Sequence, residues 1–326
     1  MTSQLNRRIA LLVLTSAVSA PLIGRAAVFP ERPMRLIVPF PAGGAADFMA
    51  RLLAQHLGEL LGQQVLIENR GGAGGTLAAE LVARAPADGY TLLFATMGTH
   101  AINPSLYPKL RYDPLKDFVP VALTHITPRV LVVGPSVKAR SVAEFVAIAK
   151  ATPGQITYGS AGNGSSSHLS GALFESMAGV DMIHVPYKGS APLLTDLLAG
   201  RVDATFDSFT VYEEHIRSGR VLALGVTSRT RMASLPQVPT LAESGLVGYE
   251  VSNWLGLMAP TGTPREIVAT LHTAATRAMG DAGMRRQLGA LGIEPVSSKP
   301  EEFAALIRSE IPKWARIVKM SGARVE

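Results

Sequence analysis

Two short segments carry the residue types from which an anion-binding site could be built. The first reads Pro39-Phe-Pro-Ala-Gly-Gly44, and the second reads Ser-Ala-Gly-Asn-Gly-Ser-Ser-Ser-His over residues 160–168. Each follows an apolar run typical of a buried strand and precedes a helical pattern. The first N–H groups of a helix have no partner within it and lie at the positive end of its dipole. Both junctions therefore predict a site for a carboxylate or another anion, made largely from backbone donors.

Further polar residues are predicted to share a rim with these two loops. Ligands of open parallel sheets bind beyond the carboxyl ends of the strands, where Met97-Gly98-Thr99, Tyr187 and Asp207-Ser208 are expected. If two sheets present such ends to each other, their donors face across a cleft, and a dicarboxylate would suit that arrangement. The candidate ligand-binding residues are Phe40, Pro41, Ala42, Gly43, Gly44, Asp47, Met97, Gly98, Thr99, Ser160, Asn163, Gly164, Ser165, Ser166, His168, Tyr187, Asp207 and Ser208.

Each of these features also has a purely structural interpretation. The glycine pair at residues 43–44 could form only a tight turn, and Asp47 could serve only as an acid in the first turn of a helix. Serines at the start of a helix commonly cap it. Ser166, His168 and Asp207 could instead form a hydrolase triad, but the sequence lacks the Gly-X-Ser-X-Gly turn of such enzymes. We therefore favour capping with ligand contact over catalysis.

The sequence gives no sign of a cofactor or metal site. The glycine run at residues 71–75 matches neither the phosphate-binding loop, because no Gly-Lys-Ser/Thr follows, nor the dinucleotide fingerprint. The seven histidines are scattered, without the spacing of metal ligands. There is no cysteine, which excludes disulfides, thiolate ligands and cysteine nucleophiles. We expect a binding protein rather than an enzyme.

Strands alternate with helices along most of the chain, a pattern that predicts parallel sheets covered on both faces. Strands are predicted over residues 35–40, 65–68, 90–95, 129–133, 156–159, 182–185, 202–206 and 221–226. The principal helices are predicted to begin near residues 45, 76, 142, 168, 190, 264 and 300. Ser141 and Glu144 have the spacing of a capping box, and Gly62 is placed to end the first helix.

The long extended apolar segments 118–127 and 249–259 are predicted to pair as strands that cross between two domains. The expected fold is therefore α/β with two domains, each a mostly parallel sheet flanked by helices. Domain 1 is expected to comprise residues 28–125 and 252–326, and domain 2 residues 126–251. The chain length of 326 residues is sufficient for two such domains.

The first 27 residues have the features of a cleaved signal peptide. Arg7 and Arg8 precede a short apolar run, and small residues follow up to Ala26 and Ala27, near which cleavage is expected. Removing residues 1–26 deletes three arginines and no acids, so the formal charge falls from +6 to +3. This balance does not suggest a nucleic-acid-binding protein. The mature chain is expected in the periplasm of a Gram-negative cell.

An ordered set of motifs resembles one receptor family over residues 29–322. The motifs are PFPAGGAAD, ENRGGAGG, APADGYTLLF, INPSLY, YDPLKDFVPV, GNGSSSHLSG, VPYKG and VPTLAESG. They resemble the substrate-binding proteins of tripartite tricarboxylate transporters, also called the Bug family of extracytoplasmic solute receptors. The resemblance implies a Venus-flytrap fold of the periplasmic-binding-protein type, and a monomeric receptor that delivers a carboxylate to a two-component membrane permease.

The resemblance also implies roles for the predicted loops. The loop at 40–47 would contact one end of the ligand, often through water, and the loop at 160–168 would hold a carboxylate. The segments 97–99 and 207–208 would line the cleft. Where the family commonly has a hydroxyl residue, this chain has Ala46, which removes one polar side chain from the first loop. A sensor that signals to a kinase stays open as an alternative role, because both roles use domain closure.

We expect ligand selectivity to be set by residues 96–100. Met97 and His100 in that segment suggest room for a larger or aromatic dicarboxylate. The identity of the ligand does not follow from the sequence, because backbone donors recognise a carboxylate and not the body that carries it.

Overall fold

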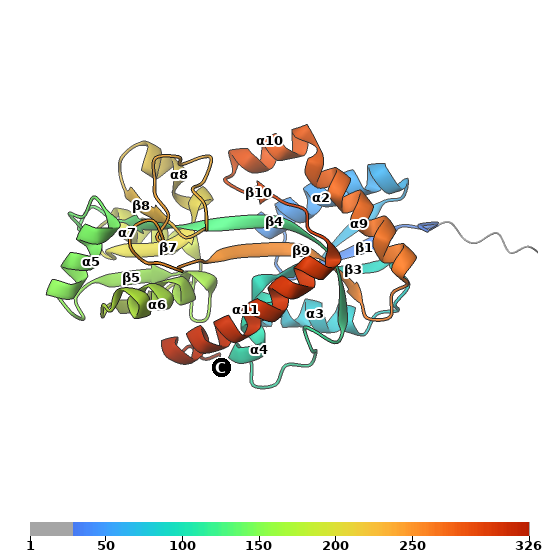
Figure 1. Ribbon diagram of the computed structural model, residues 1–326, viewed down its shortest axis with the longest axis horizontal. Coiled ribbons are helices and arrows are strands. Elements are labelled where there is room, and N and C mark those ends of the chain that lie inside the picture. Colours follow the sequence, from blue (N-terminus) through green and yellow to red (C-terminus); the bar gives the residue numbers. More distant parts are fainter. Residues whose placement is uncertain (1–28, 326) are drawn as a thin grey trace, which may run out of the picture.

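The computed structural model describes residues 29–325, and the strands within that range form one curled mixed sheet (Figure 1). The predicted signal peptide lies outside the described residues. The strands are β1 (Met34–Val38), β2 (Val65–Asn69), β3 (Thr91–Thr96), β4 (Phe118–Val133), β5 (Thr157–Ser160), β6 (Ile183–Pro186), β7 (Ala204–Ser208), β8 (Leu222–Val226), β9 (Ser252–Pro260) and β10 (Glu294–Pro295).

Helices cover the sheet along its length. They are α2 (Ala45–Leu61), η1 (Ala73–Gly75), α3 (Thr76–Ala83), η2 (Gly98–Ile102), α4 (Asn103–Leu106), α5 (Val142–Ala151), α6 (Ser166–Ala178), α7 (Ser190–Leu198), α8 (Phe209–Arg217), α9 (Arg265–Gly280), α10 (Ala282–Ala290) and α11 (Pro300–Ser321). Among the described residues, no helix combines the length and the apolar character needed to cross a membrane.

The strand order β2-β1-β3-β9-β4-β7-β5-β6 places a parallel group at each end of the sheet. β1 pairs in parallel with β2 and β3, and β5 pairs in parallel with β6 and β7. The parallel βαβ arrangement expected from the sequence is therefore present in both groups. Among the described residues, every antiparallel strand pair involves β4 or β9, and these pairs make the sheet mixed.

The long strands β4 and β9 connect the two parallel groups, as Figure 1 shows. They pair antiparallel from Phe118↔Pro260 to Pro128↔Ser252. Beyond that point β4 leaves β9 and pairs with β7 and β8. The strand predicted over 129–133 is thus not separate, because it continues the crossing segment without a break.

The local signals at helix ends act largely as expected. Gly62 ends α2 in the left-handed conformation, with φ of 69°. The Ser141 hydroxyl accepts a hydrogen bond from the N–H of Glu144, at 3.2 Å. The Glu144 carboxylate in turn accepts from the N–H of Arg140, at 2.7 Å, one residue earlier than a strict capping box requires.

The C-terminal helix α11 lies across the molecule and reaches α6 in the other strand group (Figure 1). Its Trp314 is fully buried, and the indole N–H donates to the Glu310 carboxylate at 2.7 Å. Near its end, the Ser176 hydroxyl of α6 contacts the sulfur of Met320 at 3.9 Å. This helix therefore adds a second connection between the two parallel groups.

Candidate ligand-binding cleft

A cavity of about 1200 Å³ lies between the β1–α2 loop, the β5–α6 loop and the crossing strands. The predicted site residues that line it are Phe40, Pro41, Ala42, Gly43, Gly44, Gly98, Asn163, Gly164, Ser165, Ser166, Asp207 and Ser208. Asp47, Met97, Thr99, Ser160, His168 and Tyr187 are not among the lining residues. The two loops singled out in the sequence therefore meet at one cavity.

The β1–α2 loop needs a glycine at position 43 for its backbone conformation. Gly43 has φ of 85°, in the left-handed region that side chains disfavour, although an added Cβ would meet nothing within 4 Å. Gly44 then caps α2, and no side chain accepts from the first turn at that position. The loop consequently presents backbone groups and the half-exposed ring of Phe40 to the cavity.

Asp47 fixes this loop from behind. Its carboxylate accepts hydrogen bonds from Gly43 N–H, Arg51 Nε and Asn69 Nδ2, each at 2.9 Å. Asn69 Nδ2 also donates to the carbonyl of Phe40 at 3.0 Å. Mainly through the hydrogen bond from Arg51, these partners lower the pKa of Asp47 to about 2. Asp47 thus supports the loop as an ionised residue that is only 4% exposed.

The β5–α6 loop uses two of its three serines internally. The Ser165 hydroxyl donates to the carbonyl of Gly162 at 2.6 Å and accepts from the N–H of His168 at 3.3 Å. The Ser167 hydroxyl accepts from the N–H of Ala161 at 2.9 Å. Ser166 begins α6, so its N–H and that of Ser167 have no acceptor within the helix. The positive end of α6 therefore opens on the cavity.

Two stacked histidines support this loop from the side away from the cleft. His168 and His184 lie with ring centroids 3.7 Å apart and nearly parallel planes. His168 Nδ1 accepts from the N–H of Gly164 at 3.1 Å, and His184 Nε2 lies 2.7 Å from the Ser160 hydroxyl. Burial lowers the pKa of each histidine to about 4. Both rings are therefore neutral at neutral pH, and each has a hydrogen bond with a residue of the loop.

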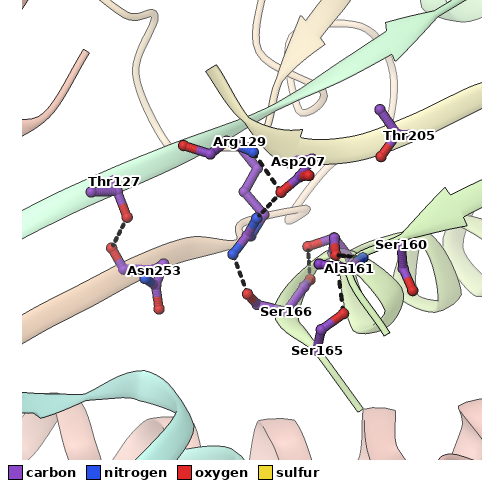
Figure 2. Close-up of polar contacts among 12 residues, drawn as sticks. Thr127, Arg129, Ser160, Ala161, Ser165, Ser166, Thr205, Asp207 and Asn253 are labelled. Carbon is purple, nitrogen blue, oxygen red and sulfur yellow. Dashed lines mark hydrogen bonds and ion pairs between the residues drawn. The ribbon is translucent and has the colours of Figure 1, made fainter. Parts of the chain in front are cut away.

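Arg129 is a cavity residue that the sequence reasoning missed. It stands on β4 where that strand leaves β9, and its Nη1 donates to Asp207 Oδ1 at 2.9 Å (Figure 2). Its Nη2 donates to the hydroxyl of Ser166. Burial lowers the pKa of Arg129, and the neighbouring carboxylate opposes that shift. The sequence feature that could have identified Arg129 is its position as a lone arginine before the apolar run at residues 130–133.

Most side chains of residues 96–100 do not reach the cavity, although this segment was expected to set ligand selectivity. Thr99 and His100 belong to the π-helical turn η2, and Met97 directly precedes it; all three are fully buried and do not line the cavity. The Thr99 hydroxyl lies 2.9 Å from His100 Nδ1 and donates to the carbonyl of Thr96 at 3.0 Å. Only Thr96 and Gly98 of this segment line the cavity. The inference of a larger ligand from Met97 and His100 therefore loses its basis.

The geometry also removes the support for a Ser-His-Asp triad. The Ser166 hydroxyl meets the guanidinium of Arg129, a cation and not a base. His168 lies in the wall of a separate cavity of about 1080 Å³, beneath the C-terminal segment. Tyr187 does not line the cleft either, and its hydroxyl donates to Asp196 at 2.9 Å. These side chains are not arranged to activate a nucleophile.

The remaining cavity wall is largely apolar. Phe48 of α2 is 40% exposed and lines the cavity, as Phe40 does. Leu291 and Ile293 come from the segment after α10, a helix not expected from the sequence. Within residues 29–325 no group of three His, Cys, Asp or Glu side chains could hold a metal ion. The cavity thus has a polar wall at α6 and an apolar wall at α2.

The sequence matches the family model described as "Tripartite tricarboxylate transporter family receptor" over residues 49–323. A protein of Pseudomonas sp. described as "UPF0065 protein in tcbD-tcbE intergenic region" is 42% identical, over 95% of this chain and 91% of its own length. Protein BugT of Bordetella pertussis is 38% identical, over 98% of this chain and 97% of its own length.

Two solved structures are similar along their entire chains. R. palustris Rpa4515 with adipate has a TM-score of 0.79 and 40% identity, and the match covers 91% of this chain and 100% of that one. MatC from Rhodopseudomonas palustris with bound malate has a TM-score of 0.74 and 38% identity, with coverage of 89% and 100%. Both of those proteins are described with a small organic acid.

Proposed function

Because the chain belongs to the tripartite tricarboxylate transporter family of receptors, we propose that it captures a small organic acid in the cleft described above. As a member of this family it is a periplasmic solute-binding receptor and not an enzyme. The single observation that carries the proposal is the open N-terminus of α6, whose first N–H groups lie at the cavity wall. Its proposed occupant is a carboxylate.

The two helix starts at the cavity are not equivalent. At α2 the ionised Asp47 lies in the first turn and already balances the positive end of the helix. At α6 the first turn carries no acid. An incoming carboxylate is therefore favoured at α6, and the rest of the ligand extends toward Phe40 and Phe48. A dicarboxylate places its second group near the backbone of the β1–α2 loop.

The proposed mechanism of capture is closure of two domains. Domain 1 comprises residues 28–125 and 252–326, and domain 2 comprises residues 126–251. The hinge lies where β4 and β9 separate, beyond the pair Pro128↔Ser252. A cavity of about 1200 Å³ exceeds the usual range for small-molecule sites, about 300–1,000 Å³. Closure around a small acid reduces that volume and brings both loops to the ligand.

The proposed destination of the solute is a two-component membrane permease, reached by a monomeric receptor in the periplasm after signal-peptide removal near Ala26 or Ala27. The family description supports this role. A sensor that reports to a kinase would use the same closure. The two roles differ in the protein that binds the closed receptor. Transport is tested by reconstituting the permease pair in vesicles. Uptake of the acid only when the receptor is added would establish transport.

A thermal-shift screen of the mature chain against mono-, di- and tricarboxylic acids tests the capture step. Adipate and malate belong in the panel, with their neutral diamides as controls. An acid at a hundredfold excess over its Kd stabilises the folded state by about 2.7 kcal/mol and raises the midpoint accordingly. If no acid raises the midpoint, or if the diamides do so equally, the carboxylate proposal fails.

A further inference from the structure

Arg129 and Asp207 are the only charged side chains among the residues that line the cleft within the described chain. They form an ion pair at 2.9 Å, and their side chains are 11% and 4% exposed. The buried cation of this pair lies beside the proposed carboxylate site. Two interpretations follow: the pair is only a structural contact, or Arg129 also binds the ligand.

The guanidinium group of Arg129 has more donors than its protein partners accept. An arginine carries five N–H donors in a planar fork. Nη1 uses one on Asp207, and Nη2 uses one on the Ser166 hydroxyl. Nε is buried and has no hydrogen-bond partner within residues 29–325. Further acceptors are therefore needed, and a carboxylate oxygen is the strongest kind available.

The position of the guanidinium places its remaining donors beside those of α6. Because Nη2 contacts Ser166, the first residue of α6, the planar group lies at the open end of that helix (Figure 2). Asp207 holds Nη1 from the β7 side, and its own Oδ1 also accepts from the N–H of Ser208 at 2.8 Å. The contacts with Asp207 and Ser166 thus fix the orientation of the Arg129 fork.

We propose that Arg129 contacts the ligand carboxylate directly and selects for an anion at this end of the cleft, while Asp207 positions the guanidinium. This inference rests on the proposed function and adds a specificity-determining residue to it. In the empty cleft Asp207 balances the charge of Arg129, so no bare cation is buried. When a carboxylate binds, the guanidinium shares its donors between that carboxylate and Asp207.

The proposal predicts opposite effects from changing the two members of the pair. Asp207→Asn keeps an acceptor for Arg129 and Ser208 N–H but removes the negative charge, so the net charge of the pair rises to +1. Affinity for the acid should stay the same or increase. Arg129→Gln removes the cation and the planar five-donor fork, leaving a neutral amide, and affinity should fall by roughly 30-fold or more, as for other buried charge pairs that lose one member.

The test is calorimetric titration of wild type and variants with two ligands. One is an acid that raises the thermal-unfolding midpoint of wild type, and the other is the monomethyl ester of that acid. The double variant R129Q/D207N removes both charges, which avoids an unpaired buried carboxylate, and it should lose affinity as R129Q does. Arg201→Gln is the matched control, because it removes an exposed pair with Asp196 at 2.7 Å, and it should bind like wild type.

Equal losses in D207N and R129Q, or wild-type affinity in the folded double variant, would overturn the role of Arg129 and leave the ion pair as a structural contact. These outcomes require that wild type binds the acid. If wild type binds no carboxylate at all, the proposed function fails first, and the two failures are thereby distinguished.

Discussion

Replacing Asp47 by asparagine tests how the β1–α2 loop is held. The carboxylate binds the N–H of Gly43 and the side chains of Arg51 and Asn69. Its pKa falls from 3.8 to about 2, which corresponds to about 2.4 kcal/mol at 1.36 kcal/mol per unit. Because the Arg51 side chain is 55% exposed, solvent screening reduces this to about 1–2 kcal/mol. Asp47→Asn should lower the free energy of unfolding by that amount at pH 7.

The pH dependence of this loss has a defined sign. A carboxylate whose folded-state pKa is lowered stabilises the protein above its unfolded pKa and loses that effect as pH falls toward the folded value. The contribution of Asp47 should therefore disappear between pH 3.8 and about 2. In urea titrations, the difference between wild type and D47N at pH 3 should be roughly half that at pH 7.

Asp281→Asn provides the matched control. Asp281 caps α10 and accepts from the N–H of Met284 at 2.8 Å, far in sequence from the loop. Both variants should lose stability, but only D47N should also weaken ligand binding, because Asp47 is hydrogen-bonded directly to the cleft-lining Gly43 whereas Asp281 bonds Met284, which does not line the cleft. A D47N protein as stable as wild type at pH 7, or a deficit that does not change with pH, would refute the reasoning.

Two further predictions concern the β5–α6 loop. Gly164→Ala should destabilise the protein by at least about 1–2 kcal/mol and weaken ligand binding, because Gly164 has φ of 70° and its added Cβ would lie 2.6 Å from Leu106. Gly179→Ala, with φ of 63° and nothing within 4 Å, should be milder in urea titrations and leave binding unchanged; equal effects in both assays would contradict this account. His168 and His184 have pKa values of about 4, lowered by burial from 6.5, so the unfolded chain takes up their protons first. The contribution of these two histidines to stability should be constant above pH 6.5 and fall toward pH 4 by up to about 1.4 kcal/mol per pH unit for each histidine; a flat profile in wild type, or one that His184→Gln leaves unchanged, would contradict it.

The parts of the cleft that were predictable from sequence are those fixed by local signals. A strand followed by Pro-X-Gly-Gly, or by a glycine- and serine-rich run, predicts a turn and a helix start from neighbouring residues alone. The parallel sheet edges then follow from the alternation of strands and helices. The loops at 40–44 and 163–166 accordingly lie at the cavity. Whether they bind a ligand stays a prediction.

The parts that sequence could not predict depend on distant contacts. Arg129 becomes a cleft residue only because β4 continues past β9 and pairs with β7, in the register Arg129↔Ser208. Pro128 interrupts the apolar pattern of β4, so the sequence predicts two separate strands, at 118–127 and 129–133, where the structure has one. Thr99 is buried within the π-helical turn η2, and Met97 is buried just before it. Nothing in a five-residue segment distinguishes that turn from an ordinary helix start.

The central claim is that this receptor recognises a carboxylate through the start of α6. The most direct measurement is a calorimetric titration of the mature chain with the acid selected by the screen, compared with the monomethyl esters formed at each end. We predict one saturable site per chain for the acid and a large loss of affinity when the carboxylate at α6 is esterified. Equal affinity for the acid and all its esters would contradict the claim, because the N–H groups of Ser166 and Ser167 would then have no anion to bind.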